Sequence, residues 1–204
     1  MLERAPFHAV TGGGRPVARV RLFTPRRIED DRGWLSETFN ARTLAQLGVD
    51  VSFVQDNQAL SRAPGTVRGL HFQMPPRAQA KLVRCLRGRI FDVAVDIRRG
   101  SPTYGRWVGA ELSAQNGRQL FVPANFAHGY VTLDPDTEVF YKVSDHYAPD
   151  CEAGIRFDDP QLAIDWPLPP TGAILSVKDR TLPLLRDIKS PFAYEGAPLE
   201  PLEA

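Results

Sequence analysis

Two segments that each end in a histidine contain the residue types best suited to catalysis. The first runs from Gly65 to His71, with five residues between the glycine and the histidine. The second runs from Gly117 through Pro123 to His128. Histidine suits proton transfer near neutral pH because its unperturbed pKa is about 6.5. A catalytic metal usually needs three imidazole or carboxylate ligands, and the two segments supply only two imidazoles, which favours acid–base chemistry.

The same two spacings resemble the paired motifs of cupins, which are small jelly-roll barrels with a site inside. In metal-binding cupins a second histidine stands two positions after the first and is followed by a glutamate. Here Gln73 occupies the position of that second histidine, and the stretch from Met74 to Lys81 contains no carboxylate. We therefore predict no metal site. We also expect no cofactor, because no nicotinamide or flavin motif is visible.

Nine short segments provide a more specific resemblance. They are Asp31–Gly33, Phe53–Asn57, Val67–Gln73, Gln79–Arg84, Phe91–Ile97, Ser101–Gly105, Phe126–Gly129, Ile164–Pro167 and Leu175–Asp179. Together they are similar to segments of the dTDP-4-dehydrorhamnose 3,5-epimerases, and they occur in that family's order. A single such string would be weak evidence. Nine in order, covering nearly the whole chain, predict both the family and its cupin fold.

The chemistry of this family explains which residue types are needed. Epimerisation beside a ketone requires a base on one face of the sugar ring, an electrophile at the ketone oxygen and a proton donor on the other face. The resemblance implies that His71 is the base and that Asp179 orients it. It assigns stabilisation of the enolate to Lys81 and reprotonation to Tyr141. Taken alone, the four would be a core histidine, a surface aspartate, an edge lysine and a packed aromatic.

Binding of the nucleotide must depend on side chains, because the sequence has no phosphate-binding glycine loop. The resemblance implies that the nucleotide-sugar is contacted by Arg32, Glu37, Gln55, Asn57, Arg68, His128, Glu152 and Lys178. Tyr147 resembles a family tyrosine near the nucleotide, where its ring would stack. The chain departs from the family pattern at Gln58-Ala59 and at Asp145-His146-Tyr147. These departures bear on substrate choice rather than on the type of reaction.

Short strands are the elements that must position these residues. From Lys81 onward apolar and polar residues alternate, as in Phe91–Ile97, which is the pattern of a half-buried strand. Further strands are predicted over 81–86, 107–112, 119–122, 130–133 and 138–143, with Gly-, Pro- and Asn-containing turns between them. The alternation puts Lys81 on one strand face with Val83 and Cys85. It puts Tyr141 on the face of Val139 and Val143.

The remaining patterns complete an all-β interpretation. One helix is expected, with Asn40 as its N-cap, Gly48 as its stop, and Leu44 and Leu47 on its buried side. Many short strands and 18 prolines predict an all-β fold, a cupin or jelly-roll β-barrel with a few short helices. We divide the chain into an N-terminal arm (1–17), a single cupin-like epimerase domain (18–190) and a C-terminal tail (191–204). The stretch from Glu195 is expected to be exposed.

The composition is that of an ordinary soluble domain of 204 residues, with 43% hydrophobic and 24% charged residues. A net charge of +1, from 25 basic and 24 acidic residues, argues against a nucleic-acid partner. The two cysteines, Cys85 and Cys151, are too few for a disulfide framework or a four-ligand zinc site. We expect no signal peptide in Met1–Pro16, no membrane partner and a cytoplasmic location.

The leading hypothesis is a dTDP-4-dehydrorhamnose 3,5-epimerase that inverts C3 and C5 of dTDP-4-dehydro-6-deoxy-D-glucose without a metal. An epimerase that inverts only one of these carbons is the alternative, and Tyr141 mildly favours double inversion. A metal-dependent cupin and a non-catalytic sugar-nucleotide binding module are two further possibilities. Gln73 argues against the former, and the set of four catalytic residues argues against the latter. The resemblance also implies a homodimer with exchanged N-terminal strands, in which Arg32 and Glu37 reach the neighbour's site.

Overall fold

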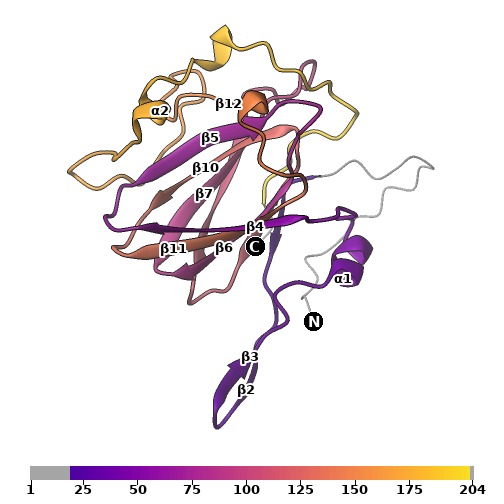
Figure 1. The fold of residues 1–204 in the computed structure, drawn as a ribbon, viewed down its shortest axis with the longest axis vertical. Coiled ribbons are helices and arrows are strands. Elements are labelled where there is room, and N and C mark those ends of the chain that lie inside the picture. Colours follow the sequence, from indigo (N-terminus) through magenta and orange to yellow (C-terminus); the bar gives the residue numbers. More distant parts are fainter. Residues whose placement is uncertain (1–18, 203–204) are drawn as a thin grey trace.

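Two five-stranded antiparallel sheets form the framework of the protein in the computed structural model, which describes residues 19–202 (Figure 1). The first sheet has the order β1 (Arg21–Phe23), β9 (Gln119–Val122), β6 (Lys81–Arg87), β11 (Thr137–Val143) and β4 (Gln55–Ser61). The second has the order β12 (Glu152–Gly154), β5 (Val67–Gln73), β10 (Phe126–Thr132), β7 (Arg89–Asp96) and β8 (Trp107–Ser113). The chain changes sheet at every connection from β4 to β7, and again at every connection from β8 to β12. This is the jelly-roll arrangement that the sequence predicts.

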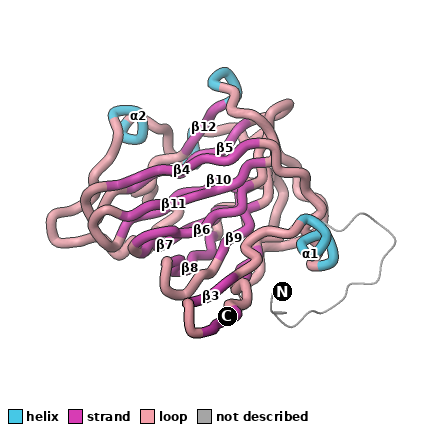
Figure 2. The backbone as a smooth tube through the Cα atoms, turned by 60° about the horizontal axis from the view of Figure 1, so that its bottom comes forward, coloured by secondary structure: helices cyan, strands magenta, loops and turns pink. Residues whose placement is uncertain are grey.

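Few helices accompany the sheets. The helix α1 (Ala41–Gln46) begins at Asn40, whose side chain accepts hydrogen bonds from two backbone N–H groups, as predicted. A second helix, α2 (Val177–Arg180), lies on the opposite side of the molecule from α1 (Figures 1 and 2). Two short 3-10 turns, Pro149–Cys151 and Leu185–Asp187, complete the set among the described residues. No helix in this part of the chain is long and apolar enough to cross a membrane.

A two-stranded hairpin projects away from the barrel (Figure 1). It consists of β2 (Ile28–Asp30) and β3 (Gly33–Leu35), which pair only with each other. The strand β1, which precedes the hairpin, pairs with β9 of the same chain. The predicted arm over 1–17 lies outside the described residues.

The inner faces of both sheets and most of the outer face of the second sheet are buried, whereas the first sheet leaves the outer face of β4 exposed. Between the sheets lies a cluster that includes Val83, Cys85, Ala94, Leu120 and Val139. The outer face of the first sheet packs against α1 in a second cluster, and the outer face of the second sheet is covered by apolar side chains from 155–192. The strand Phe91–Ile97 was therefore wrongly interpreted as half-buried, because a long C-terminal segment without strands of its own covers the face that would otherwise meet water.

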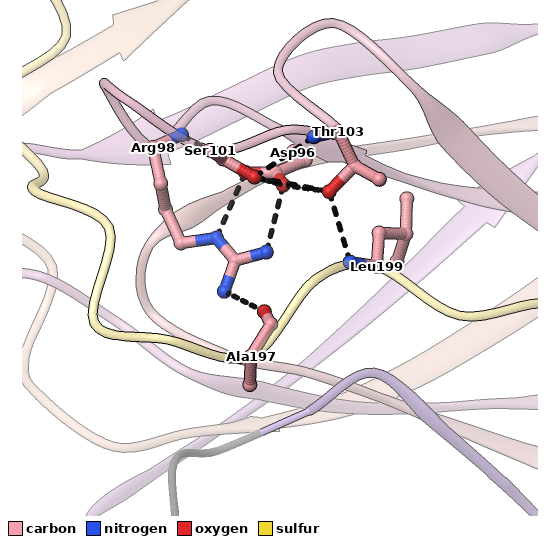
Figure 3. A network of polar contacts seen from close by, with 6 residues as sticks. All are labelled: Asp96, Arg98, Ser101, Thr103, Ala197 and Leu199. Atoms are coloured by element: carbon pink, nitrogen blue, oxygen red, sulfur yellow. Dashed lines mark hydrogen bonds and ion pairs between the residues drawn. The ribbon is translucent and has the colours of Figure 1, made fainter.

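A buried polar network fixes the C-terminal segment to the barrel (Figure 3). The guanidinium of Arg98, only 1% exposed, binds both carboxylate oxygens of Asp96 at 2.8 and 2.7 Å. Its remaining Nη1 donates to the backbone oxygen of Ala197 at 2.7 Å. The backbone N–H of Leu199 donates to Thr103 Oγ1, which itself binds Asp96. Because a buried ion pair is favourable only when its remaining groups are also bonded, the tail completes this site.

The prediction of an exposed tail from Glu195 onward is therefore wrong in part. Glu195 and Glu200 are exposed, but Ala197 is only 4% exposed. Leu199 and Leu202 pack against the cluster between the sheets. The tail contains two prolines and has no apolar periodicity, so its sequence did not indicate the contacts that its backbone makes.

Candidate active site

The four residues assigned to catalysis come from four different elements and meet at one cavity system. His71 lies in β5, Lys81 begins β6, Tyr141 lies in β11 and Asp179 lies in α2. Two adjoining cavities, of about 400 and 130 Å³, have His71, Lys81 and Tyr141 in both of their linings, and Asp179 lines the larger. The structure thus brings together all four candidates at the junction of two cavities.

An irregularity in β5 helps to shape the wall of the larger cavity. Pairing between β10 and β5 shifts between His128, opposite His71, and Tyr130, opposite Arg68, so β5 has one extra residue there. Gly69 lies at the shift with φ of +137°, and a Cβ on it would lie 2.5 Å from the Cα of Gly129. Such a bulge redirects side chains, and Arg68 lines the larger cavity together with His71.

His71 and Asp179 form a hydrogen-bonded pair. The His71 Nε2 atom lies 2.6 Å from Asp179 Oδ1, and Asp179 is only 5% exposed. Burial would raise the pKa of Asp179, but the hydrogen bond and the charge of His71 outweigh it, so the pKa lies below the usual value. The ionised carboxylate can only accept, so Nε2 carries the hydrogen, and in the neutral ring Nδ1 has the free lone pair. Asp179 is held in turn by its own N–H, which donates to Ser176 Oγ at the start of α2.

Lys81 is half-buried beside this pair, and its ammonium donates to the backbone oxygen of His71 at 3.3 Å. Burial lowers the pKa of Lys81 to about 8, although the carboxylates of Asp92 and Glu152 oppose the shift. As predicted, Lys81 shares its strand face with Val83 and Cys85, both of which lie in the cluster between the sheets. A titration near neutral pH, in a cavity, is typical of functional lysines.

Tyr141 lies on the sheet opposite to His71. It belongs to β11 of the first sheet, whereas His71 belongs to β5 of the second. Its ring packs against the cluster between the sheets, as its alternation with Val139 predicts. Burial raises the pKa of Tyr141, and the positive charge of Arg68 partly opposes this. Its phenol is therefore protonated at neutral pH and can donate a proton into the cavity.

A group of polar residues surrounds the smaller cavity. Tyr147, 54% exposed, donates its hydroxyl to Glu152 Oε2 at 2.8 Å, and Glu152 also forms an ion pair with Lys178. Burial would raise the pKa of Glu152, but bonds from Lys178 and Tyr147 hold it below the usual value. Gln55 and Asn57 line the same cavity and are hydrogen-bonded to each other at 2.9 Å. The structure therefore brings these five residues together around the two adjoining cavities.

A second histidine–carboxylate pair lies in the wall of the larger cavity. His128 Nε2 is 2.7 Å from Oδ1 of Asp92, which is fully buried. Burial lowers the pKa of His128, against the opposing effect of Asp92, so its ring is neutral at neutral pH. His128 was predicted to belong to the site, but Asp92 was not. A charged residue at an inward position of a buried strand was the available signal.

Two predicted site residues lie away from these cavities. Arg32 stands in the turn of the β2–β3 hairpin, 90% exposed, and is paired with Asp30 at 2.6 Å. Glu37 is exposed and accepts a hydrogen bond from Asn40. Neither lines either cavity. Within one chain, therefore, the structure does not bring them to His71.

The polar side chains of the cavity do not form a metal site. Among residues 19–202 there is no group of three His, Cys, Asp or Glu side chains placed to hold a metal ion. Gln73 stands at the position of the second histidine of metal-binding cupins. Its amide forms hydrogen bonds with three backbone groups. The side chains present suit proton transfer beside a polarised carbonyl.

Comparison with known proteins places this geometry in a family. The sequence matches the profile of dTDP-4-dehydrorhamnose 3,5-epimerase over residues 15–187. It is 52% identical to the dTDP-4-dehydrorhamnose 3,5-epimerase of Sinorhizobium fredii over 87% of this chain and 91% of that protein. The crystal structure of the Bacillus anthracis str. Ames enzyme with TDP and PPi bound has a TM-score of 0.78 and 51% identity, covering 81% of this chain and 93% of that one.

A third relative extends the likeness to a complex with a sugar nucleotide. The Legionella pneumophila dTDP-6-deoxy-D-glucose-3,5-epimerase, in complex with dTDP-4-keto-L-rhamnose, has a TM-score of 0.82 and 44% identity, covering 87% of this chain and 94% of that one. Sequence, fold and coverage therefore agree, and the chain belongs to the dTDP-4-dehydrorhamnose 3,5-epimerase family.

Proposed function

We propose that the protein inverts C3 and C5 of dTDP-4-dehydro-6-deoxy-D-glucose, with the sugar at the junction of the two cavities. The observation that carries the proposal is that His71, Lys81 and Tyr141 line both cavities. The two inverted carbons flank a single ketone at C4. One electrophile at the ketone oxygen therefore serves both steps.

The first step is removal of a proton from a carbon next to the ketone. The free Nδ1 of His71 accepts this proton, and the electrons of the broken C–H bond move to the ketone oxygen as an enolate. The Lys81 ammonium stabilises the negative oxygen, and the buried carboxylate of Asp179 stabilises the imidazolium at 2.6 Å. The fold already holds these charges in place, so they need not reorient during the reaction as water molecules would.

The second step delivers a proton to the other face of the ring. Tyr141, on the opposite sheet, donates its hydroxyl proton to the same carbon as the enolate returns its electrons to the ring. The carbon is then inverted, His71 holds the abstracted proton, and both groups are reset by exchange with solvent. Arg68 lies close enough to Tyr141 to stabilise the phenolate formed in this step.

A pH profile tests the role of Lys81. Burial lowers its pKa to about 8, so the ammonium is charged below that value and neutral above it. We expect kcat/KM to fall on an alkaline limb with an apparent pKa of about 8, because the neutral amine no longer stabilises the enolate. The control is Lys81→Arg, whose charge persists and whose residual activity should lack this limb. A wild-type profile that stays flat well above pH 8 would contradict this role.

The smaller cavity and its rim are suited to the nucleotide. We propose that Tyr147 stacks on thymine, that Gln55 and Asn57 contact the nucleotide, and that Arg68, His128, Glu152 and Lys178 contact the pyrophosphate and sugar. Support comes from their positions, because Tyr147, Gln55, Asn57 and Glu152 line the smaller cavity and Arg68, His128 and Lys178 line the larger.

Incubation with dTDP-4-dehydro-6-deoxyglucose in heavy water, with EDTA present, tests the reaction. Mass spectrometry should show enzyme-dependent uptake of about two solvent deuterons together with inverted product. Uptake of about one deuteron would instead identify a single-carbon epimerase. Exchange that stops in EDTA and returns with added metal would overturn the metal-free mechanism. Tight binding without exchange would leave a binding module.

We further propose a homodimer in which the β2–β3 hairpin brings Arg32 and Glu37 to the partner's cavity. Support comes from three large apolar side chains on the projecting hairpin, Ile28, Trp34 and Leu35, which are 58%, 54% and 73% exposed. Clustered exposed apolar groups are typical of interfaces.

Light scattering should give the mass of a dimer at micromolar concentration. The variant Leu35→Asp should be monomeric and should lose activity, because Arg32 and Glu37 no longer reach a second site. Leu168→Asp, at an exposed leucine outside the hairpin, is the control and should remain dimeric and active. A wild-type monomer would contradict the proposal.

A further inference from the structure

Glutamine side chains hold the loop that carries Tyr147. The loop consists of residues 145–148, between β11 and the 3-10 turn Pro149–Cys151. Gln79 donates to the backbone oxygen of Asp145 at 2.7 Å, and Gln73 donates to that of His146 at 3.3 Å. In the other direction, the Tyr147 N–H donates to Gln55 at 3.1 Å. The Ala148 N–H also donates to Gln73, at 2.8 Å. The backbone of all four loop residues is therefore hydrogen-bonded to glutamines from β4, β5 and the segment before β6.

Gln73 makes more hydrogen bonds to backbone than the other two glutamines do. It is only 3% exposed, and both its amide oxygen and its amide nitrogen are bonded to backbone. The nitrogen also donates to the oxygen of Arg77 at 2.6 Å, so Gln73 ties the turn after β5 to the loop. Buried amides that bond only to backbone fix local geometry, and their removal leaves peptide groups without partners.

The side chain of Tyr147, in contrast, has little that would hold it in place. It is 54% exposed, and its hydroxyl bonds to Glu152. The position of the ring over the smaller cavity therefore depends on where the backbone of the loop is held. That cavity is lined by all three glutamines as well as by Tyr147.

We propose that Gln73, together with Gln79, is a positioning residue for nucleotide binding and acts through Tyr147. The inference rests on the proposed nucleotide contact of Tyr147. Gln73, which stands where metal-binding cupins have a histidine ligand, would then serve nucleotide binding. A loop that is already held in place does not have to be ordered when the nucleotide binds, so the glutamines favour binding. Their hydrogen bonds all go to backbone groups and not to His71 or Tyr141.

The test measures binding of dTDP by calorimetry and steady-state kinetics with Gln73→Met, which keeps the size of the side chain but removes its three hydrogen bonds. We expect the Kd of dTDP and the KM of the sugar nucleotide to rise by about tenfold, with kcat within about twofold of wild type. Gln79→Met, at a half-buried position with one such bond, should show a smaller rise in the same direction. The matched control is Gln161→Met, at an exposed glutamine outside both cavities, which should bind dTDP normally.

A double-mutant cycle separates this inference from the proposed function on which it rests. Tyr147→Ala should weaken dTDP binding, and adding Gln73→Met to it should change the Kd by less than about twofold. If Tyr147→Ala weakens binding but neither glutamine variant does, the positioning role is overturned while the nucleotide contact stands. Additive effects, or a fall in kcat at unchanged Kd, would also overturn it. If Tyr147→Ala binds dTDP normally, the nucleotide contact itself is wrong. Should Gln73→Met fail to fold, Gln79→Met carries the same cycle.

Discussion

His71→Asn should abolish both epimerisation and solvent exchange while leaving nucleotide binding intact. Asparagine retains a polar side chain of similar reach but cannot accept a proton at neutral pH. We expect kcat to fall by about 10³-fold or more, and the uptake of deuterium at both flanking carbons to fall in parallel, because no proton leaves either carbon without the base. The Kd of dTDP should stay within about twofold, since His71 faces the sugar at the junction of the cavities.

Two further variants make this test specific. Asp179→Asn should also lose activity strongly, because an amide can donate to Nε2 and thereby leave Nδ1 protonated, the wrong tautomer for a base. His146→Asn should behave as wild type, because the side chain is exposed outside both cavities and only the backbone oxygen of this residue helps to hold the loop of Tyr147. Rapid deuterium uptake by His71→Asn would assign the base to another residue, and His128 would then be the next to replace.

Much of the framework was predictable because local patterns determine it. The alternation in 81–143 predicted strands close to those observed, except that β10 begins at Phe126 and not at the predicted residue 130. The N-cap at Asn40 marked the start of α1. The two strands before Lys81 that carry site residues, β4 and β5, were not predicted from alternation. In β4 the sequence Gln-Asp-Asn-Gln is polar throughout its first half, and in β5 the bulge at Gly69 interrupts the alternation. In β5 the bulge that shapes the cavity wall also removes the sequence pattern by which the strand could have been predicted.

The site was predictable only where a family motif supplied it. Tyr141 and Lys81 were assigned to inward faces by alternation, but nothing local indicated that Asp179, in a helix of four residues, would reach His71 across the sequence. Contacts of this kind depend on how distant segments pack. The same is true of Asp92 beneath His128, of the backbone of Ala197 on Arg98, and of Gln73 under the loop of Tyr147. A sequence shows these residues but not their partners.

Tyr141→Phe should separate the two halves of the reaction. The variant keeps the base, so His71 still removes a proton, exchanges it with solvent and returns a deuteron to the same face of the sugar. We expect substrate recovered from heavy water to carry deuterium at unchanged configuration, and the formation of inverted product to fall by about 10²–10⁴-fold. Mass spectrometry measures the label, and NMR of the sugar ring measures the configuration.

Tyr130→Phe is the comparison that decides between two tyrosines of the same cavity. Its hydroxyl is buried and has no hydrogen-bond partner among the described residues, so its removal costs little by itself. Tyr130 lies in β10, on the same sheet as His71, whereas Tyr141 lies on the opposite sheet. Inversion requires a donor on the face opposite to the base, and so Tyr130→Phe should keep forming inverted product. If Tyr130→Phe lost inversion and Tyr141→Phe kept it, the donor would be Tyr130, and the two sheets would not correspond to the two faces of the sugar.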